Sequence, residues 1–342
     1  MGCSRVEQNA DKPKLDTEKT ATPASFTFVQ VSDSHLGFSR EPNRDVAETY
    51  REAIAKINAL PQRPAFVLHT GDLTHLAKPE EFDAVDQLHR TFRAGEIYCV
   101  PGEHDVTEND CRAYMERYGQ GAVRGGNGWR SFDHQGVHFV GLNNCMNLHA
   151  GSLGLLGQDQ LDWLGQDLTG KTDSTPIVVF AHIPLWTVHA PWGWGTQDSE
   201  RALKLLRRFG SVTVLNGHIH QIMQKVEGNV TFHTARSTAF PQGVPGVAPS
   251  AGPMRDVPAG RLRSLIGVTK VNYVERNNTL ASPMTPWDKP QANPIIEIRF
   301  VGCNAWKHYT RSSAHVESVH ENHALQNDGC RWCSDVMPVR DE

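Results

Sequence analysis

Short apolar runs recur between residues 26 and 234, and each has the composition of a buried β-strand. The runs are rich in Val, Ile and Phe and are flanked by Pro, Gly and Asp, which is typical of strands covered on both faces. They predict strands at Phe26–Val31, Ala65–Leu68, Ile97–Val100, Ile177–Phe180 and Val212–Leu215, with further candidates at Val137–Leu142 and Val230–Thr234.

Apolar residues between these runs recur every three or four positions, the period of an amphipathic helix. Such patterns cover Val46 to Leu60, Phe82 to Phe92 and Leu161 to Leu168, with a weaker one at Leu203 to Phe209. Because strands and helices alternate, we expect an α/β fold in which helices cover a central sheet.

Five of the predicted strands run directly into His, Asp or Glu. Ligands of open α/β sheets collect beyond the carboxyl ends of the strands, so we expect these polar side chains to share one site. The segments are Asp33-Ser-His35, Gly71-Asp72, Gly102-Glu103-His104-Asp105, Ala181-His182 and Gly217-His218-Ile-His220.

The residue types in these segments favour a metal centre. Carboxylates and imidazoles without cysteine suit zinc, iron or manganese. Five histidines and four acidic residues are too many for one ion, whereas two ions sharing a bridging carboxylate fit the number. Paired ions about 3.5–4 Å apart catalyse in-line displacement at phosphorus.

The ordered motifs D-x-H, G-D, G-x-H-D, H and G-H-x-H resemble those of the calcineurin-like metallophosphoesterase superfamily, in particular a bacterial branch similar to class III cyclic nucleotide phosphodiesterases. The resemblance covers roughly residues 26–240. It implies a four-layered α/β/β/α sandwich with the metals at the C-terminal strand ends. By motif, one ion is expected on Asp33, His35 and His220 and the other on His182, His218 and Glu103, with Asp72 bridging and His104 catalytic. Asp105 follows His104 and could orient its ring.

The resemblance implies hydrolysis of a phosphodiester by attack of a metal-bridging hydroxide. His104, if protonated, would stabilise charge on the phosphoryl group or on the leaving oxygen. The resemblance implies a cyclic nucleotide similar to cyclic AMP as the lead substrate, and we expect two divalent or mixed-valence ions of iron, manganese or zinc as the metals. The alternatives are a phosphomonoesterase with the same centre, or a metal-binding protein whose catalysis is weakened by Glu103.

Glu103 stands where the family pattern has Asn, a neutral oxygen ligand. With Asp33, Asp72 and Glu103 ionised, the predicted donor set carries three negative charges against four from two divalent ions. An extra charge about 4 Å from a phosphoryl group costs up to roughly 4 kcal/mol at an effective dielectric near 20. We therefore expect Glu103 to favour a trivalent ion or to weaken phosphate binding.

Other polar and aromatic residues lie beside these motifs without belonging to them. We expect His69, His75, His138 and His233 to be strand residues or to support the ligands. The segment after His182 contains Trp186, Trp192 and Trp194, which either stack on an apolar leaving group or pack this loop onto the core.

Composition restricts the partners. The chain has 342 residues, 39% of them apolar, and a net charge of −4, so it can form one large α/β domain. It has no Lys/Arg block, which argues against nucleic acid as the main partner and leaves a small phosphoester as the expected one. The sequence carries no signal for an oligomeric state. The seven cysteines include a lone Cys330-Arg-Trp-Cys333, which we interpret as an incidental tail motif rather than a zinc site.

The ends of the chain differ from its middle. We expect a disordered leader or tether over 1–24, the metallophosphoesterase domain over 25–275 with a Pro/Gly-rich loop at 241–260, and an irregular tail over 276–342. No transmembrane run and no signal-peptide core is found, which indicates a cytoplasmic protein. The alternative is a periplasmic or lipid-anchored protein, attached at Cys3 if an upstream signal is missing.

Overall fold

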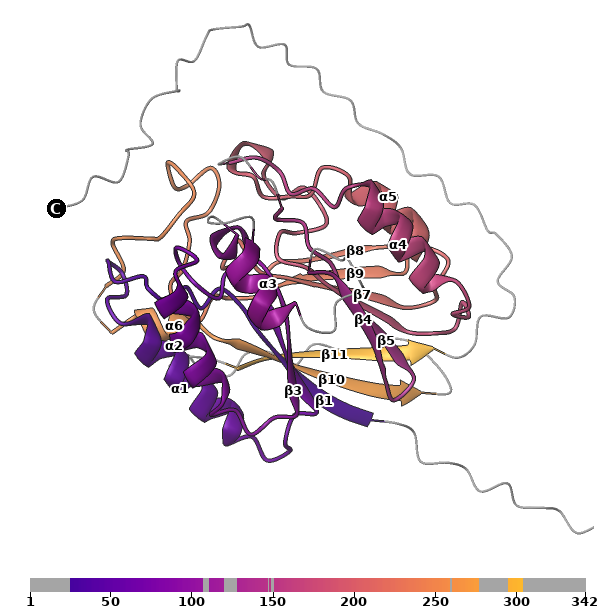
Figure 1. The fold of residues 1–342 in the computed structure, drawn as a ribbon, viewed down its shortest axis with the longest axis horizontal. Coiled ribbons are helices and arrows are strands. Elements are labelled where there is room, and N and C mark those ends of the chain that lie inside the picture. Colours follow the sequence, from indigo (N-terminus) through magenta and orange to yellow (C-terminus); the bar gives the residue numbers. More distant parts are fainter. Residues whose placement is uncertain are drawn as a thin grey trace, which may run out of the picture. The chain divides into compact units, whose positions relative to one another are not determined.

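The protein forms two β-sheets with helices on their outer faces (Figure 1). A computed structural model describes residues 25–106, 111–119, 128–146, 148, 151–258, 260–276 and 295–303. The first sheet has the order β11-β10-β1-β2-β3, in which β1, β2 and β3 are parallel. Its strands are β1 (Ser25–Val31), β2 (Phe66–Thr70), β3 (Glu96–Val100), β10 (Val268–Arg276) and β11 (Ile295–Cys303).

The second sheet has the order β4-β5-β6-β7-β9-β8. Its middle strands β5, β6, β7 and β9 are parallel, and an antiparallel strand lies at each edge. The strands are β4 (Arg130–His134), β5 (Val137–Gly141), β6 (Ile177–Phe180), β7 (Val212–Asn216), β8 (Gln224–Glu227) and β9 (Val230–Thr234).

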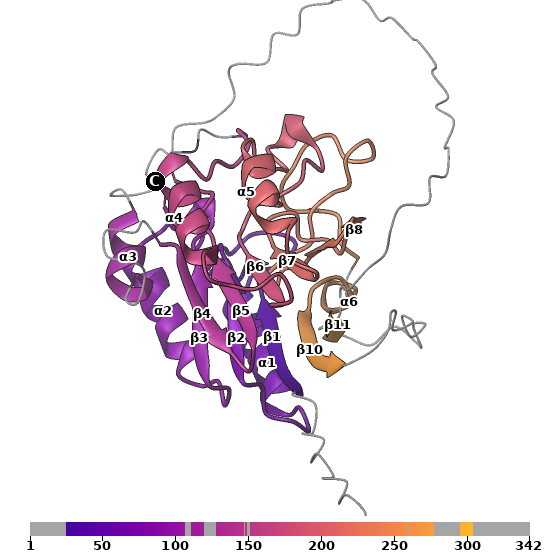
Figure 2. The same ribbon diagram turned by 90° about the vertical axis from the view of Figure 1, so that its right-hand side faces the viewer.

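Helices cover the outer face of each sheet, as two views of the ribbon show (Figures 1 and 2). Apolar side chains of α1, α2 and α3 pack on the first sheet in one buried cluster. Those of α4 and α5 pack on the second sheet in another. The helices are α1 (Val46–Asn58), α2 (Pro79–His89), α3 (Arg112–Tyr118), α4 (Gln158–Leu168), α5 (Ser199–Leu206) and α6 (Leu262–Leu265).

A third buried cluster, rich in aromatic side chains, joins the two sheets. The ring of Phe139 on β5 lies 5.5 Å from that of Phe28 on β1 and 5.1 Å from that of Phe66 on β2. Side chains alternate between the faces of a strand. On β1, Phe26 and Phe28 therefore enter this inter-sheet core, whereas Val29 and Val31 face the helices. The layers run helix, sheet, sheet, helix, which confirms the predicted α/β/β/α sandwich.

All seven predicted strands and all four predicted helices are present within the described residues, with ends shifted by at most a few positions. The strand β11 lies in the region 276–342, for which we predicted no regular element; it pairs in parallel with β10. The leader 1–24 and the Cys330–Cys333 motif lie outside the described residues, and the division into domains stays a prediction. No helix of the described part is long and apolar enough to cross a membrane.

Candidate metal centre

The five polar segments follow the carboxyl ends of β1, β2, β3, β6 and β7, and hydrogen bonds tie them together. Asp33 donates its backbone N–H to Gly71 O at 3.0 Å, and His104 donates its own to Asp72 Oδ1 at 3.0 Å. The backbone N–H of His218 lies 3.1 Å from Asp33 Oδ1. Segments that are far apart in the sequence therefore lie together at the ends of their strands.

Five of the predicted ligands have a positive φ angle, which residues other than glycine rarely adopt. Such left-handed conformations cost on the order of 1–3 kcal/mol each and concentrate at functional sites. The φ angles are 53° at Asp33, 44° at His35, 52° at Asp72, 69° at His218 and 53° at His220.

Gly71 and Gly102, the glycines of two motifs, are required by close packing. A Cβ atom at Gly102 would overlap the Asp72 carboxylate, and one at Gly71, where φ is 92°, would lie 2.5 Å from His182 Nδ1. These glycines let two loops approach side chains of the site closely.

A first group of donor atoms comes from the loops after β1 and β7. His220 Nε2 lies 3.2 Å from Asp33 Oδ1 and 3.3 Å from His35 Nε2. His35 Nε2 in turn lies 3.5 Å from Asp72 Oδ2. Asp33, His35, Asp72 and His220 are all almost fully buried, so these nitrogen and oxygen donors meet below the protein surface.

A second group lies around Glu103. Its Oε2 is 2.8 Å from His182 Nε2, and its Oε1 is 2.9 Å from His218 Nδ1. His182 Nε2 also lies 3.3 Å from Asp72 Oδ2. The same oxygen of Asp72 thus lies within 3.5 Å of nitrogens from both groups.

The free donor atoms of this site fit metal ions. His182 Nε2, Glu103 Oε2 and both ring nitrogens of His218 are buried atoms without a hydrogen-bond partner among the described residues. Buried polar atoms normally have such a partner. The other ring nitrogens of two histidines are fixed, because His182 Nδ1–H donates to Thr70 O at 2.7 Å and His220 Nδ1–H to Phe240 O at 2.6 Å. Metal-binding histidines make this kind of bond, and here it leaves each Nε2 lone pair directed at the cluster.

Electrostatic interactions within the second group keep the Glu103 carboxylate ionised. Burial opposes ionisation of Glu103, yet the neighbouring His218 and His182 hold its pKa well below the ordinary value. Burial likewise opposes protonation of His182, but Asp72 and Glu103 raise its pKa well above the ordinary value. A metal bound at His182 would therefore displace a proton, so that metal affinity depends on pH.

His104 lies beside both groups, and its ring is held by a backbone carbonyl. Its Nδ1–H donates to His75 O at 2.7 Å, which leaves Nε2 as the exchangeable nitrogen. Burial lowers the pKa of His104, but Asp72 and Glu103 outweigh this effect and raise it above the ordinary value. His104 also belongs to two of the residue groups whose donor atoms lie close enough to share an ion, one with Asp72 and Glu103 and the other with His35 and His75.

Asp105 lies under the site rather than on the His104 ring. Its carboxylate accepts hydrogen bonds from the backbone N–H groups of Leu73, Thr74 and Gly102 and from the Thr74 hydroxyl, at 2.8–3.0 Å. The group that fixes His104 Nδ1 is the carbonyl of His75. Asp105 therefore joins the loops after β2 and β3, and any effect on His104 passes through the backbone.

Two residues at the site carry no signal in the sequence that we interpreted as catalytic. His75 stacks on His104, with ring centroids 4.9 Å apart and planes 16° apart. Phe240 stacks on His35 at 4.7 Å and 28°. Of the aromatic loop, Trp194 is buried and Trp186 packs on Phe232, which favours the packing interpretation for both.

Proteins with related sequences carry phosphoesterase names. The chain is 24% identical over 274 residues to glycerophosphodiester phosphodiesterase GpdQ of Enterobacter lignolyticus, covering 76% of this chain and 93% of the relative. It is 26% identical over 246 residues to a protein of Synechococcus named as a probable cyclic nucleotide phosphodiesterase, covering 71% and 92%. It is also 24% identical over 243 residues to serine/threonine-protein phosphatase CPPED1 of Danio rerio, covering 64% and 77%.

A solved structure and a family model also match the chain. Purple acid phosphatase PPD1 from yellow lupin superposes with a TM-score of 0.51 at 12% identity, covering 73% of this chain and 49% of the lupin chain, which shows a shared fold. The model of the calcineurin-like phosphoesterase family matches residues 26–222. The match covers more than half of the sequence and contains all the predicted site residues. The chain belongs to the calcineurin-like phosphoesterase family and is a hydrolase with candidate metal-binding residues at the ends of its strands.

Proposed function

We propose that the chain hydrolyses a phosphodiester at a two-metal centre formed by seven side chains. The observation that carries this proposal is the position of Asp72 Oδ2, 3.5 Å from His35 Nε2 and 3.3 Å from His182 Nε2. One carboxylate oxygen thereby connects two sets of buried donors. The proposed ligands are Asp33, His35 and His220 for one ion, Glu103, His182 and His218 for the other, and Asp72 for both.

When bound, such a pair of ions activates water for attack on phosphorus and neutralises charge on the phosphoryl oxygens. The donor set of nitrogen and carboxylate oxygen atoms suits zinc, iron or manganese. Glu103 adds a negative charge to the proposed shell of the second ion, which either favours a trivalent ion there or weakens the binding of phosphate.

We propose that His104 stabilises charge on the phosphoryl group or protonates the leaving oxygen. His75 O holds the proton on Nδ1, so Nε2 is the nitrogen that exchanges a proton with the substrate. In the metal-free chain, Asp72 and Glu103 raise the pKa of His104 above its ordinary value, against the effect of burial. A protonated imidazole can stabilise charge on the phosphoryl group or protonate the leaving oxygen.

The charge of Glu103 also bears on the substrate class. A phosphomonoester carries about −1.5 to −2 charges at pH 7, whereas a diester carries one. Repulsion by a nearby carboxylate is therefore greater for the monoester, by up to roughly 4 kcal/mol per additional charge at about 4 Å. Together with relatives named as diesterases, this favours a phosphodiester, with a cyclic nucleotide as the lead substrate.

A phosphomonoesterase with the same centre is the second candidate, because a relative is named as a protein phosphatase. A metal-binding protein with weakened catalysis is the third. To separate them, the full chain would be loaded with manganese or zinc, its metal content measured by elemental analysis, and its activity compared on bis(p-nitrophenyl) phosphate, p-nitrophenyl phosphate and cyclic AMP.

We expect two ions per chain and a higher kcat/KM on the diesters than on p-nitrophenyl phosphate. A preference for the monoester would contradict the diesterase assignment and support the second candidate. Two bound ions without turnover of any of the three compounds would support the third.

A further inference from the structure

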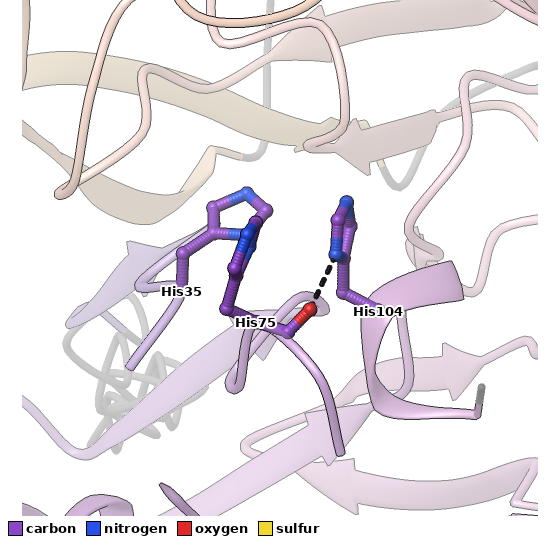
Figure 3. Close-up of side chains that lie close together, drawn as sticks. All are labelled: His35, His75 and His104. Atoms are coloured by element: carbon purple, nitrogen blue, oxygen red, sulfur yellow. Dashed lines mark hydrogen bonds between the residues drawn. The ribbon is translucent and has the colours of Figure 1, made fainter. Parts of the chain in front are cut away.

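His75 contacts both the proposed metal ligand His35 and the proposed catalytic residue His104, although it belongs to none of the sequence motifs. Figure 3 shows its ring beside those of His35 and His104. On one side, His75 Nδ1 lies 3.5 Å from His35 Nδ1. On the other side, its ring stacks on His104, and its carbonyl accepts the Nδ1–H of His104 at 2.7 Å.

The contact with His35 differs from those of the neighbouring histidines. His182, His220 and His104 each direct Nδ1–H at a backbone carbonyl, whereas His35 Nδ1 faces an imidazole. If His35 binds an ion through Nε2, its proton lies on Nδ1, and His75 Nδ1 must then accept it. His75 would carry its own proton on Nε2.

Hydrogen bonds from two neighbouring elements hold the backbone of His75 in place. A buried carboxylate on α2, that of Glu81, accepts hydrogen bonds from the backbone N–H groups of His75 at 3.2 Å and Leu76 at 2.7 Å. The N–H of His75 also lies 2.9 Å from Leu36 O. These bonds fix the loop after β2 against the loop after β1, where His35 lies.

The side-chain arrangement argues against an ion held by these three histidines. The rings of His75 and His104 are nearly parallel, with centroids 4.9 Å apart and planes at 16°. Lone pairs lie in the plane of an imidazole, so two stacked rings direct theirs side by side instead of toward one point. His104 Nδ1 is already engaged by His75 O.

We propose that His75 is a positioning residue that fixes the proton of His35 through its Nδ1 and the orientation of His104 through its stacked ring. The inference rests on the metal centre proposed above and adds a residue that touches neither ion nor substrate. The His75 side chain then has two roles: Nδ1 accepts the proton of His35, and the ring stacks on His104. Two substitutions separate these roles.

In His75→Phe the ring stays and the acceptor is lost. In His75→Asn the side-chain oxygen can take the place of Nδ1 and the ring is lost. The control is His89→Phe, which replaces another partly buried histidine in contact with Tyr50 rather than with the site. Each variant would be made in the full chain, with metal affinity measured by titration of the metal-free protein with Zn²⁺ and kcat measured on bis(p-nitrophenyl) phosphate at saturating metal.

We expect His75→Phe to weaken binding of one Zn²⁺ by about 10- to 100-fold, the usual effect of losing the partner of a metal-binding histidine, and His75→Asn to restore affinity to within about threefold of wild type. We expect kcat to fall by roughly two- to tenfold in His75→Asn and less in His75→Phe. His89→Phe should change neither quantity.

Wild-type affinity and kcat in both His75 variants, even with a lower melting temperature, would show that His75 only packs and would overturn the inference. Loss of a third ion in His75→Phe would also overturn it, because the three histidines would then form a site of their own. If the wild-type chain binds Zn²⁺ but hydrolyses no phosphoester, the proposed function fails, and the metal titrations still decide the role of His75 Nδ1.

Discussion

Glu103 Oε2 lies 2.8 Å from His182 Nε2, and the two atoms approach without completing a hydrogen bond. Glu103 Oε1 lies 2.9 Å from His218 Nδ1 in the same way. One carboxylate therefore faces two imidazoles at distances at which an ion could be shared. Its longer side chain occupies a position for which the family resemblance implies asparagine, and it adds a charge there.

Replacing Glu103 by Asn should remove this charge while keeping an oxygen donor. We expect the KM for p-nitrophenyl phosphate to fall by about five- to tenfold, well within the upper limit of roughly 4 kcal/mol for one charge at about 4 Å, and the KM for the singly charged diester to fall less. We also expect the bound metals to shift toward divalent ions. Steady-state kinetics and elemental analysis measure both effects.

The matched control for this change is Glu80→Gln on the exposed side of α2. It removes one carboxylate from the surface and should leave KM and metal content unchanged. If Glu103→Asn likewise changes neither metal content nor KM, the charge of Glu103 does not control binding.

Replacing His104 by Ala should separate proton transfer from metal binding. General acid–base groups contribute about 10²- to 10⁴-fold to the rate, so we expect kcat on bis(p-nitrophenyl) phosphate to fall by that range. His104 is not among the seven proposed ligands, and both ions should remain by elemental analysis. Loss of an ion instead would make His104 a ligand, as its proximity to Asp72 and Glu103 would allow.

Replacing Asp105 by Asn should lower stability more than it changes the chemistry. The carboxylate accepts four hydrogen bonds from Leu73, Thr74 and Gly102, and an amide that directs N–H groups at these donors leaves some of them unpaired. Each unpaired buried donor costs about 1–3 kcal/mol, so chemical denaturation should show a loss of that order. An unchanged free energy of unfolding together with a large loss of kcat would instead make Asp105 directly catalytic.

The sequence predicts the strands and helices well because most of the predicted strands are apolar runs buried on both faces and each helix buries one periodic face. Phe26 and Phe28 alternate with Val29 and Val31 on β1, and the pattern is visible without a structure. The edge strand β4 was not predicted, since Arg130–His134 is mostly polar and only partly buried. The Gln135-Gly136 turn, with φ of 45° and 81°, is the signal that could have shown its hairpin with β5.

The site was predictable only in part, for the same physical reason. Residues at the ends of parallel strands converge whatever the detail of the loops, so the clustering of Asp33, Asp72 and His182 follows from the order of elements. The contact of His75 with His35 depends on how two loops pack, and no periodicity encodes it. The acceptors of the ring protons, such as Phe240 O, are backbone atoms that any residue supplies.

His89, on the helix side of the first sheet, should make stability depend on pH. Its Nε2 lies 2.9 Å from the hydroxyl of the buried Tyr50, and burial lowers its pKa from 6.5 to about 4. The unfolded chain therefore binds a proton at higher pH than the folded chain does. Stability from this group is fully present above pH 6.5 and is lost as the pH falls toward 4.

Between pH 8 and pH 5, this difference in proton binding lowers the free energy of unfolding by up to about 2 kcal/mol. In His89→Gln the side-chain amide can still pair with the Tyr50 hydroxyl but does not titrate. We expect urea denaturation to give this variant a smaller loss of unfolding free energy than wild type over that interval, by up to the same 2 kcal/mol or so, while the two differ little at pH 8. Parallel stability curves for the two proteins would mean that the His89 ring is as readily protonated in the folded chain as in the unfolded one, and that other histidines cause any acid sensitivity.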